Sequence, residues 1–241
     1  MVAKEKPFLT IFTRTCKRPA MLSNLIRSIM KQSDWDIEQI FCVDRSGNHP
    51  GGNVLWANNQ IPKHKYRVDG EYVYFQDDDK EMIFPYFVEE LKAIVKAEHY
   101  PAVVLVRSMC ATKEVGSLHF LPLPDVWNVN WREGKRPKRW AGHALDYVVR
   151  NDYWKQHIGA YTGKTHGGDC HFGTALISDH KAHIVRLDKV ISVTMQRGRG
   201  VKFENCKPGW WKRIVKEFGL IENLGGNTPE TEDWRLRLWK Q

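Results

Sequence analysis

Strand-like and helix-like segments alternate along the first half of the chain, and this alternation constrains the fold more than any other feature of the sequence. The strand-like segments are short apolar runs at Phe8–Thr13, Ile37–Val43, Tyr72–Phe75 and Ala102–Val106. Helical spacing of apolar residues begins at Pro19 and again at Pro85. Alternation of this kind predicts an α/β protein in which helices flank a mostly parallel sheet.

The second half of the chain gives weaker signals. Further strands are predicted at Asp146–Val149 and Val190–Met195, and a short helix at Cys170–Asp179. Residues 201–241 are expected to form an irregular, basic extension that ends in a tail helix or arm at Glu222–Gln241.

Polar residues directly follow three of the predicted strands. They are Arg14–Arg18, Asp44–Gly52 and Asp77–Asp79. Ligands of open α/β sheets bind beyond the carboxyl ends of the strands. We therefore expect these three loops to gather at one edge of the sheet and to form a binding site.

Three adjacent carboxylates, Asp77, Asp78 and Asp79 (the acid triplet), end the third predicted strand. Their mutual repulsion costs free energy unless a positive charge offsets it. Because Mg²⁺ and Mn²⁺ bind carboxylate and phosphate oxygens, one interpretation is a site for a metal and a diphosphate, and the other is a solvated turn. Asp44 ends the second strand, where it suits hydrogen bonds from a nucleobase or ribose, or else an Asx turn before Ser46.

The chain carries 37 Lys and Arg against 28 Asp and Glu, a formal charge of +9, and its isoelectric point is about 9.3. Such a charge favours polyanionic partners: nucleic acid, an acidic membrane surface or phosphorylated small molecules. No run approaches the roughly 18 apolar residues of a membrane-spanning helix, which argues against integral membrane association. The five cysteines show no paired spacing, so we expect the protein to reside in a reducing cytoplasm. For a viral protein this would be the cytoplasm of the host cell.

The loop Thr13-Arg14-Thr15, the segment Val43-Asp44-Arg45-Ser46-Gly47 and the acid triplet together resemble the nucleotide-binding half of GT-A glycosyltransferases, particularly the family-2-like enzymes. The resemblance implies a GT-A-like (Rossmann-like) fold and a nucleoside-diphosphate sugar donor, with a UDP-sugar favoured. It also implies that Asp77 and Asp79, as a DxD motif, bind manganese or magnesium. The donor-binding residues that it implies are Thr13, Arg14, Arg18, Asp44, Asn58, Asp77 and Asp78.

The resemblance continues into the second half of the chain. Val148–Arg150, Ile158–Tyr161 and Gly167–Phe172 match an Arg-bearing strand, a Gly-aromatic loop and a helix opening of the family. By this match Asp169 is the catalytic base of an inverting enzyme; on its residue type alone it is a helix N-cap. Gly168 stands where the family has Glu, and Gln196 where many members have a metal-ligating His.

We therefore predict a GT-A-like catalytic domain at residues 1–200, in which 1–110 bind the donor and 111–200 the acceptor. A basic and aromatic extension follows at residues 201–241. The predicted activity is transfer of a sugar from a nucleotide sugar to an acceptor hydroxyl.

Basic residues and aromatics are interleaved at residues 132–140 and 197–216. Grooves of this composition neutralise nucleic-acid phosphates and stack on bases, so the expected acceptor is a hydroxymethylated pyrimidine in DNA, flipped out of the duplex. Two alternatives stay open: a peripheral transferase that acts on a lipid-linked or surface glycan, and a non-catalytic nucleic-acid-binding α/β protein. The residues assigned to the acceptor are Trp140, His171, Arg197, Arg199 and Lys202.

Overall fold

The computed structural model describes residues 6–44, 65–114, 117–122, 147–157, 175, 179, 181–194, 209–218 and 232–237. At residue 44 and in 110–114, 117–122 and 232–237 it describes the backbone alone. No helix in this part of the chain is long and apolar enough to cross a membrane.

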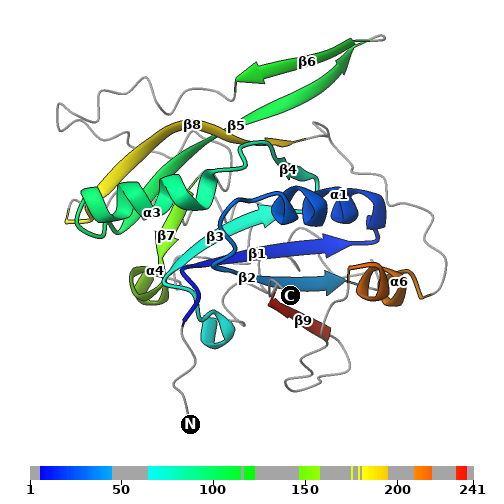
Figure 1. The fold of residues 1–241 in the computed structure, drawn as a ribbon, viewed down its shortest axis with the longest axis horizontal. Coiled ribbons are helices and arrows are strands. Elements are labelled where there is room, and N and C mark those ends of the chain that lie inside the picture. Colours follow the sequence, from blue (N-terminus) through cyan, green and yellow to red (C-terminus); the bar gives the residue numbers. More distant parts are fainter. Residues whose placement is uncertain are drawn as a thin grey trace.

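The described strands form one mixed sheet of nine strands in the order β4-β8-β5-β7-β3-β1-β2-β9, with β6 paired to β5 (Figure 1). The strands are β1 (Leu9–Cys16), β2 (Ile37–Asp44), β3 (Tyr72–Asp77), β4 (Lys80–Met82), β5 (Val103–Glu114), β6 (Ser117–Pro122), β7 (Tyr147–Arg150), β8 (Ile184–Thr194) and β9 (Glu232–Arg237). Strand β1 is parallel to both β2 and β3, and β5 is parallel to β8. The other pairs are antiparallel.

The α/β class predicted from the sequence is confirmed, and the parallel arrangement holds across β1, β2 and β3. It ends at β7, which lies between β3 and β5 and is antiparallel to both. Strands β5 and β6 are separated only by Val115 and Gly116. Because a parallel connection needs a crossover of a dozen or more residues, this short link permits only a hairpin.

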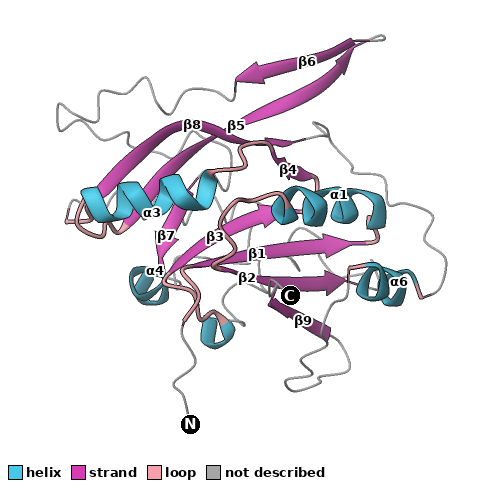
Figure 2. Cartoon of the chain, viewed as in Figure 1, coloured by secondary structure: helices cyan, strands magenta, loops and turns pink. Residues whose placement is uncertain are grey.

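Helices cover both faces of the sheet (Figure 2). They are α1 (Pro19–Met30), α3 (Phe87–Ala97), α4 (Asn151–His157) and α6 (Trp210–Glu217), with a 3₁₀ turn, η1, at Lys65–Arg67. Helices α1, α3 and α6 share one hydrophobic cluster with Ile11 of β1, whereas Trp154 of α4 belongs to a second cluster with Phe12. Successive β1 residues thus pack on opposite faces, as the period of two in a strand requires.

Helix α1 forms as its sequence predicts. It begins at Pro19, which lacks the backbone N–H that would otherwise have no intrahelical partner there. Leu22, Leu25, Ile26 and Ile29 recur at helical spacing and are buried. Because each buried side chain of this size contributes about 1.5–3 kcal/mol, this apolar stripe holds α1 on the sheet.

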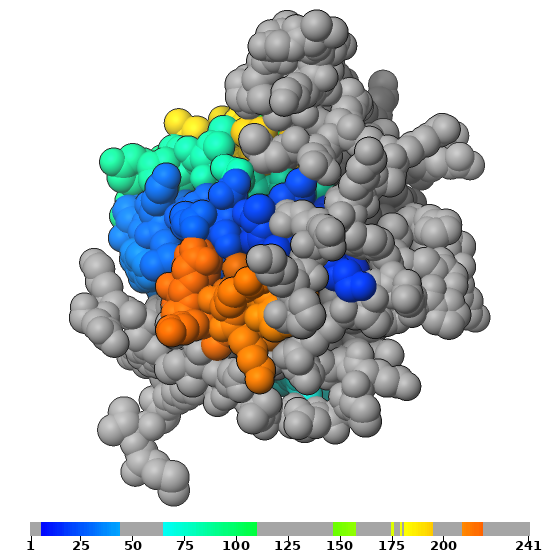
Figure 3. All heavy atoms as spheres, turned by 90° about the vertical axis from the view of Figure 1, so that its right-hand side faces the viewer, coloured from blue at the N-terminus to red at the C-terminus, as the bar shows by residue number. Residues whose placement is uncertain are grey.

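Helix α6 lies beside α1 on the face that Figure 3 shows. Arg27 of α1 forms an ion pair with Glu217, and its guanidinium carbon lies 5.5 Å from the centre of the Phe218 ring. Trp211 packs edge-on against Phe41 of β2, with ring centres 6.0 Å apart. Helix α6 thereby covers part of the hydrophobic cluster beside α1 and β2.

Within the expected tail helix or arm at Glu222–Gln241, the described residues 232–237 form a strand, and the rest of that segment lies outside the described residues. Strand β9 pairs antiparallel with β2, so that Trp234 lies opposite Phe41 and Leu236 opposite Gln39. Apolar and charged residues alternate over Trp234–Arg237, a period of two that suits a strand, and β2 offers an edge for pairing.

Candidate functional site

The carboxyl ends of β1, β2 and β3 lie side by side, as the sequence predicts. Arg14 of β1 lies opposite Asp77 of β3, and Cys16 lies opposite Asp44 of β2. Residues 14–18 and 77–79 therefore meet at one edge. Residues 14–16 and Asp77 belong to the strands themselves, because β1 and β3 continue beyond the apolar runs from which they were predicted. The backbone of Asp44 ends β2 at the same edge, whereas its side chain and residues 45–52 lie outside the described part.

Arg14 and Asp77 form the first ion pair at this edge. Arg14 Nη2 donates a hydrogen bond to Asp77 Oδ1 at 2.6 Å. The Arg14 side chain is 8% exposed and that of Asp77 is 34% exposed. Burial alone would raise the pKa of Asp77, but the charge of Arg14, joined by those of Lys80 and Arg18, outweighs burial and lowers it. Asp77 therefore stays ionised and accessible.

Arg18 joins the other two carboxylates of the acid triplet. Its Nε donates to Asp78 Oδ2 at 3.1 Å, its Nη2 contacts Asp78 Oδ1, and its Nη1 donates to Asp79 Oδ2 at 3.3 Å. Asp78 is fully buried and the Asp79 side chain is 12% exposed. A single guanidinium thus bridges two adjacent carboxylates.

The pKa values at this edge follow from burial and from these contacts. Burial disfavours the charged form of Arg18, but the surrounding carboxylates outweigh burial and raise its pKa. Burial raises the pKa of Asp78 to about 7, although Arg18 opposes the rise. Burial, together with the charge of Asp77, also raises the pKa of Asp79.

Two buried residues beside the acid triplet, Gln76 and Lys80, are not among the site residues predicted from the sequence. Lys80 is fully buried, and its charge acts on Asp77 and Asp79. Its position directly after the triplet was the available signal. Gln76, the residue before the triplet, is also fully buried, and neither of its side-chain amide atoms has a hydrogen-bond partner among the described residues.

Thr13 lies inside the core rather than at the accessible edge. It is fully buried, and Gln39 Nε2 donates to its hydroxyl at 3.5 Å. The remaining predicted site residues lie outside the described residues, so their roles stay predictions: Asn58, Trp140, Asp169, His171, Arg197, Arg199 and Lys202.

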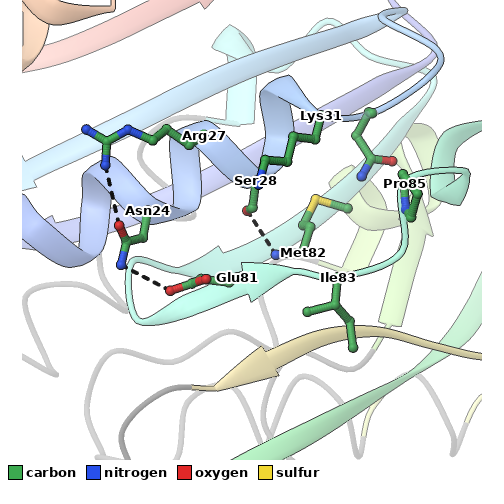
Figure 4. A pocket seen from close by; sticks show the side chains of 9 residues that line it. Asn24, Arg27, Ser28, Lys31, Glu81, Met82, Ile83 and Pro85 are labelled. Atoms are coloured by element: carbon green, nitrogen blue, oxygen red, sulfur yellow. Dashed lines mark hydrogen bonds between the residues drawn. The ribbon is translucent and has the colours of Figure 1, made fainter.

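A pocket of about 460 Å³ flanks the site between α1 and β4 (Figure 4). Hydrogen bonds cross it, from Asn24 Nδ2 to Glu81 Oε1 at 3.2 Å and from the Met82 backbone N–H to Ser28 Oγ at 2.9 Å. Strand β4 begins at Lys80, directly after the acid triplet. These bonds therefore attach the segment that follows the triplet to α1.

The predicted metal ligands do not fit a divalent cation in this arrangement. Asp77 and Asp79 carry the oxygen atoms that Mg²⁺ and Mn²⁺ prefer. However, Asp77 Oδ1 and Asp79 Oδ2 are each bonded to a guanidinium. The described residues contain no group of three or more His, Cys, Asp or Glu side chains that could hold a metal.

No protein-family model matches the chain, and a search of curated proteins gives no match. Solved structures of S. aureus TarS, a family-2-like glycosyltransferase, do match. TarS 1-349 in complex with UDP aligns with a TM-score of 0.57 at 13% identity, over 86% of this chain and 63% of that chain. TarS 1-349 in complex with UDP-GlcNAc aligns with a TM-score of 0.50 at 13% identity, over 87% and 66%.

A longer TarS structure aligns with a TM-score of 0.56 at 12% identity, over 87% of this chain and 38% of that chain. The chain thus spans less than two thirds of the length of these TarS chains. It covers 63% of TarS 1-349 in complex with UDP and 38% of the longer TarS chain. At identities this low the likeness concerns the fold. The GT-A-like fold expected from the sequence is confirmed.

Proposed function

We propose that this chain transfers a sugar from a nucleoside-diphosphate sugar, with a UDP-sugar favoured, to an acceptor hydroxyl. The observation that carries the proposal is the meeting of Arg14, Arg18 and the acid triplet at the carboxyl ends of β1 and β3. This is the edge where open α/β sheets bind ligands. The fold shared with TarS, which is solved with UDP and with UDP-GlcNAc, supports the choice of donor.

Within this proposal the carboxylates bind the nucleoside. Asp77 is the most exposed member of the acid triplet, and Arg14 holds one of its oxygens in place. A fixed, ionised carboxylate accepts hydrogen bonds from ribose hydroxyls with little loss of side-chain entropy. Asp44 ends the neighbouring strand β2 at the same edge, and we assign it to the base or ribose from this position and from the family resemblance.

Asp169 is the proposed catalytic base. It would take the proton of the acceptor hydroxyl as that oxygen attacks the anomeric carbon and the nucleoside diphosphate leaves. Asp169→Asn is expected to bind donor normally and to lose turnover by about 10²-fold or more, the usual contribution of general base catalysis. An unchanged turnover number would remove Asp169 from this role.

Donor binding tests the proposal directly. Isothermal titration with UDP, UDP-sugars and other nucleoside diphosphates is expected to show binding, weakened by Asp77→Ala. Asp152→Ala is the matched control, because Asp152 is an exposed carboxylate paired with Arg150 far from this edge of the sheet. If no nucleoside diphosphate binds, the proposal fails and the non-catalytic alternative gains support.

The proposed acceptor is a hydroxymethylated pyrimidine in DNA. The charge of +9 and the basic segments with interleaved aromatics support it. Binding to DNA should weaken steeply as salt is raised, and labelled sugar should pass to hydroxymethylated DNA. Binding to anionic vesicles without binding to DNA at low salt would favour a lipid-linked or surface glycan instead.

A further inference from the structure

Each carboxylate of the acid triplet already has a positive partner within this chain. Asp77 is bonded to Arg14, and Asp78 and Asp79 are both bonded to Arg18. The buried Lys80 adds a third positive charge close to Asp77 and Asp79. When the three carboxylates are ionised, three positive side chains therefore face three negative ones.

Arg18 makes the contacts that a bridging cation would make. Its guanidinium binds Asp78 through two nitrogen atoms and Asp79 through the third, and its side chain is only 13% exposed. The planar guanidinium matches a carboxylate in fixed geometry, so it orients the acids as well as neutralising them.

The backbone holds Arg18 in this place. Arg18 is the residue directly before α1, and Pro19 fixes the first turn of the helix. The apolar stripe of α1 packs into the core and holds Arg18 next to the acids. Its guanidinium therefore binds them without the loss of translational entropy that a free ion bears on binding. A metal ion at Asp79 would have to remove Arg18 or sit beside its positive charge, and both options are unfavourable.

We infer that Arg18 takes the part of the divalent cation at this site, so that the acid triplet is organised, and a nucleoside diphosphate binds, without manganese or magnesium. The inference replaces the metal requirement expected from the family resemblance. Its statement about nucleotide binding rests on the proposed function, whereas its statement about the metal does not.

Metal binding in the absence of nucleotide gives the first test. Chelator-treated protein is titrated with Mn²⁺ alone and the free ion is followed by electron paramagnetic resonance. The wild type is expected not to bind Mn²⁺ at the acid triplet. Arg18→Ala should gain Mn²⁺ binding, and adding Asp79→Asn to that variant should abolish the gain.

Arg27→Ala is the matched control, because Arg27 is an arginine on α1 whose partner, Glu217, lies outside the acid triplet. It should gain no Mn²⁺ binding. Mn²⁺ binding by the wild type that Asp79→Asn removes would overturn the inference. Should Arg18→Ala fail to fold, the wild-type and Asp79→Asn titrations still decide the question.

Nucleotide binding gives the second test. The dissociation constant of UDP for the wild type should agree within about twofold between EDTA and saturating Mn²⁺, because no metal takes part in binding. A twofold difference corresponds to less than about 0.5 kcal/mol of binding free energy. A loss of about tenfold or more in EDTA would overturn the inference, because it equals the loss of a sizeable binding contact. If UDP binds under neither condition, the proposed function fails, while the Mn²⁺ titration still judges the role of Arg18.

Discussion

Arg14 and Asp77 are 63 positions apart in the sequence, yet they occupy matching positions on two parallel strands and are joined by a hydrogen bond of 2.6 Å. The Arg14 side chain is 8% exposed, so the bond lies where the sheet meets solvent and is partly shielded from it. A contact of this kind depends on strand register, and it fixes the carboxylate that we assign to the donor.

A double-mutant cycle should measure this contact. Arg14→Met, Asp77→Asn and the double variant are expected to give a coupling energy of about 1 kcal/mol in urea denaturation, because the pair is charged but partly exposed. Arg14→Met alone should raise the pKa of Asp77, observed by NMR titration, because the guanidinium lowers it. The more exposed pair Arg150 and Asp152 should give a smaller coupling. A coupling near zero at Asp77 would show that the pair does not act as one unit.

Gly70 should not tolerate a side chain. A Cβ atom there would lie 2.5 Å from both the backbone nitrogen and Oγ1 of Thr10. Thr10 cannot easily move, since its hydroxyl accepts a bond from the Gly70 N–H and donates to the buried Glu38. Gly70→Ala is expected to reduce the free energy of unfolding by about 1–3 kcal/mol, as overpacking does.

Gly209→Ala is a useful comparison for Gly70→Ala. No atom of the described residues lies within 4 Å of a Cβ there, so among them only the backbone angle φ of 76° opposes the change. A loss of about 1–2 kcal/mol from the left-handed conformation alone is expected. If Gly70→Ala left the urea midpoint unchanged, the close packing of Thr10 against residue 70 would be refuted.

Gln76→Met should stabilise the protein. Both amide atoms of Gln76 are buried, and no described residue forms a hydrogen bond with either. The free energy lost when these atoms leave water is therefore not offset within the described part of the chain. Replacement by an apolar side chain of similar size is expected to raise the free energy of unfolding by about 1 kcal/mol. Gln32→Met is the control. It should destabilise, because Gln32 Nε2 donates to the Phe84 carbonyl at 3.0 Å and only its Oε1 has no hydrogen-bond partner among the described residues. A loss of stability in Gln76→Met would indicate that an ordered water satisfies the amide.

The contact between Asp34 and Lys92 predicts a dependence of stability on pH. Lys92 Nζ donates to Asp34 Oδ2 at 2.7 Å. Burial would raise the pKa of Asp34. The bond from Lys92, a hydrogen bond from the Asp36 backbone N–H and the charge of Lys92 outweigh burial and hold the pKa below its ordinary value of 3.8. A lowered carboxyl pKa stabilises the fold above the unfolded pKa, and this stabilisation is lost as the pH falls through the folded pKa.

Lys92→Met should therefore lower the Tm at neutral pH, and the difference from the wild type should shrink as the pH falls below about 4. The control is Lys96→Met on the exposed face of the same helix, which should give a difference that does not vary over this range. A Lys92→Met difference that stays constant into acid would contradict the assignment.

Local patterns in the sequence were sufficient for much of the fold. The runs that became β1, β2 and β3, and the periodic segments that became α1 and α3, are continuous and apolar, so their structure follows from nearby residues. The meeting of residues 14–18 and 77–79 followed from the rule for carboxyl ends of parallel strands. Strand β8 begins earlier than predicted because Arg186, Asp188 and Lys189 interrupt its apolar pattern.

Side-chain partners at the site could not be predicted in the same way. Three adjacent carboxylates indicate that a positive charge is needed, but not which one. Arg18 meets Asp78 and Asp79 across about 60 positions, and only the three-dimensional arrangement of β1, α1 and β3 brings them together. The insertion of β7 between β3 and β5 likewise depends on pairing between distant segments, which local patterns do not encode.

Strand β9 also shields its neighbour. It forms the border of the sheet beyond β2, so the peptide groups along that side of β2 are satisfied by the final part of the chain. Proteolysis ahead of Glu232 would bare a row of peptide donors and acceptors on a largely apolar strand, a template onto which another molecule could add. Loss of these residues is therefore expected to promote self-association of the protein through the exposed edge of β2.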